Sequence, residues 1–121
     1  MEQLNAPQGS GGASKNATTI AYVNSLIVWA GPARLFIVNG YNSKVAAQFI
    51  QIFDSATVPI DGAIPAIVLS VPAASGFFLD LNVYGRLFAN GVTIVNSSTG
   101  PTKTIGAADT WIDVQFMPGQ V

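Results

Sequence analysis

The sequence predicts an all-β protein, an antiparallel β-sandwich of the jelly-roll or immunoglobulin-like type with seven to eight short strands. Short runs of β-branched and aromatic residues recur along the chain, and turn-forming Gly, Pro, Asn and Asp separate them. No stretch of a dozen residues has a helical period that is free of Gly or Pro. The length of 121 residues suits one domain. We therefore expect a single β-sandwich domain at residues 18–121, preceded by a flexible N-terminal arm at residues 1–17.

The composition of residues 1–17 is what sets the arm apart. The segment is rich in Gly, Ser and Asn, and Leu4 is its only large apolar residue after the initiator. Such a segment cannot bury enough apolar surface to order itself. Two interpretations stay open. It is either a floppy terminus, as most domains have, or an arm that orders when laid across a neighbouring subunit, with Leu4, Asn5 and Pro7 in the contact.

The first half of the domain contains four strand candidates. Residues 18–23 and 26–29 are rich in β-branched and aromatic residues. Residues 34–38 form the next run, which should stop at the turn-forming Asn-Gly-Tyr-Asn of residues 39–42. Residues 45–53 carry apolar side chains on both faces, which is typical of a strand that is covered on both sides.

The second half begins with a loop at residues 54–65, where two prolines and an Asp-Gly pair favour turns. Strands are expected at residues 66–71 and from residue 76 to 81. Residues 86–89 and 92–95 flank Asn90-Gly91, a pair that favours the type I′ turn of a β-hairpin.

The last strand candidate, residues 111–116, follows a long polar loop at residues 97–106 and alternates cleanly. Trp111, Asp113 and Gln115 share the face that points away from the apolar residues between them, so we predict a solvated or interface face there. Aromatic side chains at strand positions are otherwise expected in the core. A platform for stacking sugars or bases is the alternative.

The scarcity of charge points to self-assembly. Only 9% of the residues are charged, against about 25% in an ordinary soluble domain. Since charges normally lie on the surface, we expect part of this surface to be covered in the working state. A surface of uncharged polar residues is the alternative.

Charge and hydropathy also bear on partners and location. The five basic and six acidic residues are scattered singly, which disfavours a nucleic-acid partner. No apolar stretch is long and unbroken enough for a spanning helix, which disfavours a membrane partner. No signal peptide is visible, so synthesis in the cytoplasm is expected.

Catalysis is disfavoured because the chain has no histidine and no cysteine. We assign no catalytic, cofactor-binding or metal-binding residue. Asp54 and Asp61 flank one loop and could bind a hard cation, but carboxylates cap turns far more often. Asp80 and Arg86 bracket a short segment and could form an ion pair, within the chain or across an interface. Lys103 has no obvious partner.

A family resemblance covers somewhat over half of the chain. The pattern of a strand, Gly-Tyr-Asn, a strand ending in Phe-Asp and a Pro-x-Asp-Gly-x-x-Pro loop lies within residues 34–81, and GRLFANGVTIVNSST follows at residues 85–99. These segments resemble small structural proteins of tailed bacteriophages. The resemblance implies a non-enzymatic virion component without a cofactor, namely a decoration (cement) protein on the capsid exterior. It implies a homodimer or homotrimer that binds the major capsid protein, often through an extended arm.

Two other functions stay open at this point. A receptor- or glycan-binding domain of a tail fibre or tail tip would expose aromatic residues or carboxylates in loops 54–65 or 97–109. An oligomeric β-domain with an unrelated scaffold role would expose neither aromatic residues nor carboxylates in these loops.

Overall fold

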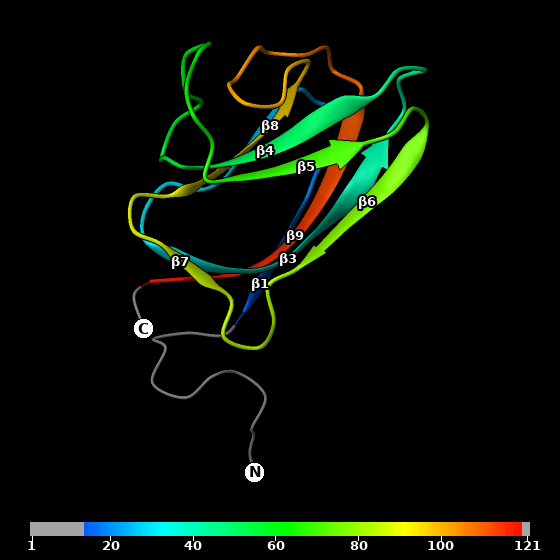
Figure 1. Ribbon diagram of the computed structural model, residues 1–121. Coiled ribbons are helices and arrows are strands. Elements are labelled where there is room, and N and C mark those ends of the chain that lie inside the picture. The colour runs from blue at the N-terminus through cyan, green and yellow to red at the C-terminus, as the bar shows by residue number, and fades with distance from the viewer. Residues whose placement is uncertain (1–13, 120–121) are drawn as a thin grey trace.

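The computed structural model describes residues 14–119, which fold into two antiparallel sheets packed face to face (Figure 1). This confirms the predicted all-β sandwich. The described residues form nine strands and no helix, so no helix among them could cross a membrane. The strands are β1 (Lys15–Thr18), β2 (Ser25–Trp29), β3 (Ala33–Asn42), β4 (Gln48–Asp54), β5 (Ile67–Val71), β6 (Ser75–Asp80), β7 (Arg86–Phe88), β8 (Val92–Ser97) and β9 (Thr110–Pro118).

The strand order is that of a jelly roll. One sheet, here the β1 sheet, has the order β1-β9-β3-β6, with β7 also paired to β3; the other, the β2 sheet, has the order β2-β8-β4-β5. When the short β7 is set aside, the first strand pairs with the last, the second with the last but one, and so on inward to β4 and β5. Such nested pairing wraps one long hairpin into two sheets, as in jelly rolls.

The core lies between the sheets and is built from alternate residues of the long strands. Leu35 and Val38 of β3 and Ile50 and Ile52 of β4 are fully buried. Full burial of one such side chain stabilises the fold by about 1.5–3 kcal/mol. The inner residues of β8 and β9, Val92, Ile94, Ile112, Val114 and Phe116, complete this core with Val28, Ala33, Val71 and Phe88.

The turn expected at residues 39–42 is absent, because β3 continues through them to Asn42. Gly40 is required there by packing. A Cβ at this position would collide with the carbonyl oxygen of Trp111 and with the ring of Phe77. Asn42 is fully buried, and its side-chain amide donates to the carbonyls of Ala46 and Pro72 at 3.1 and 3.0 Å. Gly40 and Asn42 are of types that favour turns in short segments, but in this fold they allow neighbouring segments to pack closely against β3.

The hairpin predicted at Asn90-Gly91 is wrong. β7 pairs with β3 in the β1 sheet, whereas β8 pairs with β2 and β4 in the β2 sheet. Asn90 and Gly91 therefore carry the chain from one sheet to the other, and neither has the positive φ of a type I′ turn. The Asp54 carboxylate accepts their two N–H groups at 2.9 and 3.4 Å. A Cβ on Gly91 would lie 2.7 Å from the Ser55 carbonyl oxygen.

The strand expected at residues 18–23 lies earlier, as β1, and pairs with β9. Residues 19–24 cross from one sheet to the other, and only Val23 makes a bridge, to Thr110. Residues 15–17, expected in the arm, thus belong to the β1 sheet. Residues 1–13 of the arm, with Leu4, Asn5 and Pro7, lie outside the described residues.

Candidate interaction surface

The outer face of the β2 sheet is covered by the chain itself. Gln51 and Phe53 of β4 and Val95 of β8 alternate with core residues and point away from the core, yet all three are buried. Two loops, residues 55–66 and 98–106, lie over this face (Figure 1). We call it the covered face. It confirms the prediction that β4 is covered on both sides.

Gln51 fastens one of these loops. Its side-chain amide nitrogen lies 2.9 Å from the carbonyl oxygen of Thr99, 2.8 Å from that of Gly100 and 3.0 Å from that of Thr102. Two N–H groups thus serve three carbonyls of one loop. A buried, hydrogen-bonded amide holds loop backbone where water cannot reach it.

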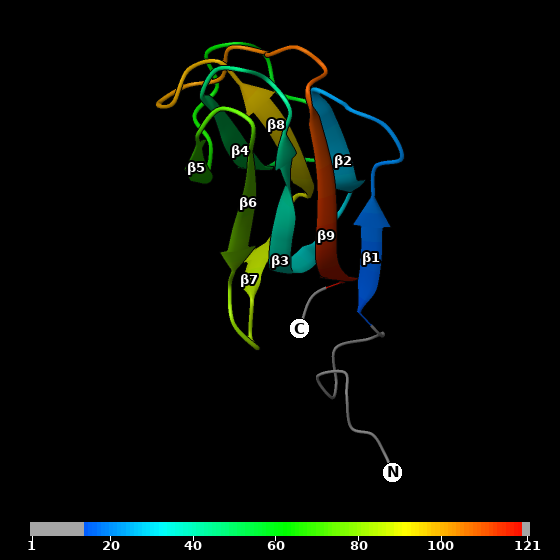
Figure 2. The ribbon, with the colours of Figure 1, turned by 90° about the vertical axis from the view of Figure 1, so that its right-hand side faces the viewer.

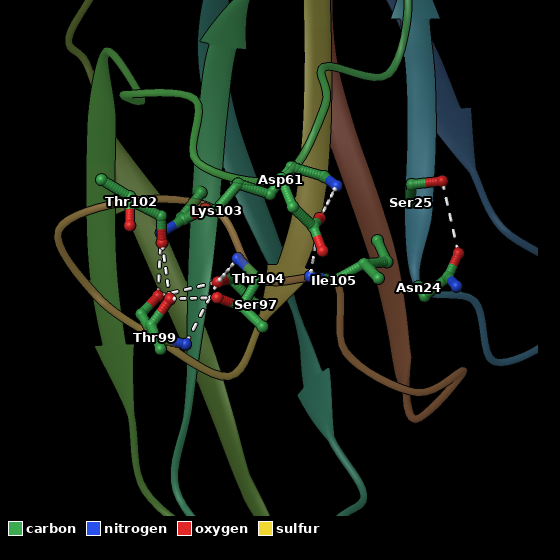
Figure 3. A network of polar contacts seen from close by, with 10 residues as sticks. Asn24, Ser25, Asp61, Ser97, Thr99, Thr102, Lys103, Thr104 and Ile105 are labelled. Atoms are coloured by element: carbon green, nitrogen blue, oxygen red, sulfur yellow. Dashed lines mark hydrogen bonds and ion pairs between the residues drawn. The ribbon is translucent and has the colours of Figure 1, made fainter.

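Lys103 joins the two loops to each other (Figure 3). Its side chain is 5% exposed, and its Nζ lies 2.6 Å from Oδ1 of Asp61. The same oxygen accepts the N–H of Ile105 at 3.2 Å. Backbone hydrogen bonds from Gly62 to Lys103 and from Lys103 to Ala63, at 2.8 and 2.9 Å, run beside the ion pair. The hydrogen bond from Lys103 is the largest of the causes that lower the pKa of Asp61.

Asp54 and Asp61 therefore do not share a cation site. Asp54 caps the crossing at Asn90, and Asp61 binds Lys103. No group of three or more potential metal ligands occurs within residues 14–119. The partner of Lys103 was missed in the sequence because it lies 42 positions away.

Among residues 14–119, no loop covers the outer face of the β1 sheet, as Figure 2 shows for β9 and β3. We call it the open face. Its aromatic residues are partly exposed, Phe78 to 64% and Trp111 to 37%. The exposure of Phe78 contradicts its expected place in the core. By strand register the open face consists of Trp111, Asp113 and Gln115 of β9, Tyr41, Asn39 and Ile37 of β3, and Phe78 and Asp80 of β6.

Asp113 is the centre of a polar network on the open face. Its carboxylate accepts hydrogen bonds from Thr18 and Asn16 of β1 and, at 3.4 Å, from Asn39 of β3. These bonds, that from Thr18 first, lower the pKa of Asp113. All three donors are neutral, so the carboxylate keeps its charge near neutral pH without a cation beside it. The network also fastens the short β1 to β9.

A shallow hollow adjoins the open face at its aromatic end. It has a volume of about 290 Å³ and is lined by residues 19–22 and Trp111. Ile20 is fully exposed and Tyr22 is about half exposed. Apolar side chains therefore continue from the open face onto the crossing segment.

The predicted site residues separate into two groups. Trp111, Asp113 and Gln115 share the open face, while a role for them in an interface stays a prediction. Asp80 and Arg86 each have another partner: the Asp80 carboxylate accepts the N–H of Asn82 at 2.8 Å, and the Arg86 guanidinium lies 5.3 Å from the centre of the Phe88 ring. Their pairing across an interface stays a prediction.

No protein-family model and no curated protein matches the chain. Among solved structures, the chain is similar to the coat protein of tobacco streak virus in a C2 crystal form, with 12% identity and a TM-score of 0.43 over 98% of this chain and 94% of that chain. It is also similar to the coat protein dimer of the same virus, with 12% identity and a TM-score of 0.41 over 98% and 92% of the two chains. The resemblance to tailed-phage proteins stays a prediction.

Proposed function

We propose that this chain is a non-enzymatic structural component of a virion, which decorates and stabilises the outside of a tailed-phage capsid. In this proposal it works as an oligomer and binds the major capsid protein. The observation that carries the proposal is the open face, a sheet surface with exposed aromatic residues. The jelly-roll topology is in keeping with it, since capsid domains use that fold, but lectins and enzymes use it as well.

The open face suits burial against another protein. Exposed aromatic residues grouped on one surface mark sites of protein interaction, and aromatic residues are enriched at interfaces. Full burial of a side chain such as Phe78 contributes about 1.5–3 kcal/mol. Hydrogen bonds already satisfy Asp113 from the sides, so a partner can cover it at a smaller cost than a bare carboxylate would impose.

The carboxylates support a structural role. Asp54, Asp61 and Asp113 each accept hydrogen bonds that hold a crossing, a loop or a strand in place. A general acid or nucleophile would instead have to face a substrate. In this fold the three carboxylates therefore hold backbone segments in place through hydrogen bonds.

The alternative of a glycan-binding tail domain has less support. It requires an exposed aromatic or carboxylate cluster in loops 54–65 or 97–109. The exposed large side chains of loop 55–66 are aliphatic, namely Val58, Ile60 and Ile64, and Asp61 is engaged by Lys103. No stacking platform is present on this loop.

Locating the chain in purified particles of its virus tests the proposal. Immunogold labelling with an antibody to the domain should decorate the capsid surface, and mass spectrometry of the particles should detect the chain in many copies. Label confined to the tail would favour the receptor-binding alternative. Absence from purified particles would refute a virion role.

The arm can be tested separately by deleting residues 2–13, because this leaves β1 intact. We expect the truncated domain to keep its thermal unfolding midpoint and to bind capsids more weakly. A chain with residues 2–13 replaced by a Gly-Ser segment of equal length controls for length alone. Full capsid binding by both variants would remove the arm from the proposal.

A further inference from the structure

We infer that Asn90 is a site of spontaneous covalent modification, at which the side-chain amide is lost as ammonia after attack by the backbone nitrogen of Gly91. The reaction converts Asn90 to aspartate or to isoaspartate, whose backbone is longer by one methylene group. This inference goes beyond the proposed function and does not depend on it.

The reaction needs only the two residues of an Asn-Gly pair and water. The backbone nitrogen of Gly91 forms a bond to Cγ of Asn90, and the amide nitrogen leaves as ammonia, which takes up the proton of the Gly91 N–H by way of solvent. A five-membered cyclic imide results. Water then opens this ring at either of its two carbonyls, which gives aspartate or isoaspartate. Glycine favours ring closure because it has no side chain to restrict its backbone.

The chain contains two Asn-Gly pairs, Asn39-Gly40 and Asn90-Gly91, and their surroundings in the fold differ. Asn39 and Gly40 lie inside β3, paired with β6 on one side and with β9 on the other. Gly40 is also buried. Its backbone nitrogen cannot turn toward the Asn39 side chain unless β3 separates from its neighbours, so the fold protects this pair.

Asn90-Gly91 lies between β7 and β8, where the chain crosses from one sheet to the other. Asn90 is exposed, and its side-chain amide forms no hydrogen bond within residues 14–119. The Asp54 carboxylate accepts the N–H of Asn90 at 2.9 Å but that of Gly91 only at 3.4 Å, beyond the usual range of about 2.7–3.2 Å. The attacking nitrogen is therefore loosely held, and its attack breaks no hydrogen bond between strands.

An Asp-Gly pair can form the same imide with loss of water, and the chain has one at Asp61-Gly62. Here both reacting groups are engaged. The Asp61 carboxylate binds Lys103 Nζ at 2.6 Å and accepts the N–H of Ile105 at 3.2 Å. The Gly62 N–H donates to the carbonyl of Lys103 at 2.8 Å. The structure thus selects Asn90 among the three pairs.

The modification disturbs a crowded crossing. A Cβ on Gly91 would lie 2.7 Å from the carbonyl oxygen of Ser55 and 2.8 Å from both Cα of Ala56 and the carbonyl oxygen of Trp29. An extra methylene in the preceding residue therefore requires neighbouring backbone to shift. The new carboxylate also lies near that of Asp54, and like charges repel each other. We expect isoaspartate at this position to lower the thermal unfolding midpoint by about 5 °C.

Incubation of the folded full chain in mildly alkaline buffer, beside the same chain unfolded in urea, tests the site. Peptide mass spectrometry measures conversion at each pair from the change of amide to carboxyl, and chromatography separates aspartate from isoaspartate. Sampling continues until both Asn-Gly pairs have reacted in urea. In the folded chain, Asn90 should react on the order of a hundredfold faster than Asn39, because Asn39 must wait for local unfolding of a central strand.

Asn90→Gln is the matched variant, because its longer side chain disfavours the five-membered ring and keeps the amide. It should begin with the unfolding midpoint of the wild type and keep it during incubation. Equal rates at Asn39 and Asn90 in the folded chain overturn the inference, as does an unreacted Asn90 when the unfolded chain has reacted. A wild type with isoaspartate at this position and an unchanged midpoint overturns the effect on the crossing.

Discussion

The two outer faces of the sandwich are built on alternating strands, yet loops within residues 14–119 cover one face and leave the other open. On the covered face, polar residues of the strands bind the loops above them: Thr93 and Ser97 donate to the carbonyls of Ser55 and Thr99 at 2.8 and 2.7 Å. On the open face, polar residues bind sideways to neighbouring strands, as Asp113 does with Asn16. The polar side chains of the two faces therefore form their hydrogen bonds in different directions.

This difference explains part of the scarcity of charge. Over β4 and β8 the covered face needs no charges, because the outward side chains Gln51 and Val95 are fully buried by the chain itself. The open face does carry charge, since Asp113 and Asp80 are two of its eight residues. Exposed apolar side chains also lie on the covering loop, Ile60 to 83% among them, so apolar surface is available to other proteins on both sides.

Gln51→Ala should produce the largest loss of stability. It removes the amide that serves three loop carbonyls and leaves a space beneath the loop. We expect a loss of about 3 kcal/mol in the free energy of unfolding, from the lost hydrogen bonds and the cavity together, measured by chemical denaturation. Gln51→Leu fills the space without a donor and should recover only part of that loss. A loss below about 1 kcal/mol for Gln51→Ala would mean that the loop does not stabilise the covered face.

Val95→Ala should cost less, about 2 kcal/mol, because it removes two methyl groups from a fully buried site beneath the loops. Val68 provides a matched control, since it lies on the same outer face but is 41% exposed. Val68→Ala should cost well under 1 kcal/mol. Equal unfolding free energies for the two variants would show that the loops do not seal the face in solution.

Acidification should release the two loops from each other. The pKa of Asp61 is lowered in the folded state, so its contribution to stability is complete above about pH 4 and is lost as the pH falls through the folded pKa. Asp61→Asn should therefore flatten the fall in stability below about pH 4. Hydrogen exchange of the Gly62 and Ile105 amides should rise in this variant at neutral pH. Unchanged acid sensitivity in Asp61→Asn would assign the effect to other carboxylates, Asp113 first.

Phe78→Ala should have the smallest effect on stability, within about 0.5 kcal/mol, because the ring is 64% exposed on the open face. The same variant should weaken self-association and capsid binding, since it removes apolar contact area. Thermal unfolding measured alongside sedimentation separates these effects. A large loss of stability would show that the ring is packed within the monomer instead.

The local residue pattern alone predicted several features of this fold correctly. The alternation of β9 put Trp111, Asp113 and Gln115 on one face, and the apolar run of β4 predicted cover on both sides. Periodicity fixes which side chains share a face, because successive residues of a strand point to opposite sides whatever sheet the strand joins. The β-branched runs likewise predicted the all-β class.

Contacts between distant segments decided what local pattern could not. Asn90-Gly91 favours a hairpin in isolation, but β7 and β8 gain more from pairing in different sheets. Gly40 resembles a turn residue and instead makes room for Trp111 and Phe77. Lys103 gained Asp61 as its partner through packing of two loops. Sequence determined the all-β class and which side chains share a face of β4 and β9, because these depend on neighbouring residues. Only the tertiary structure decided which face is covered, because that depends on loops brought together from 42 positions apart.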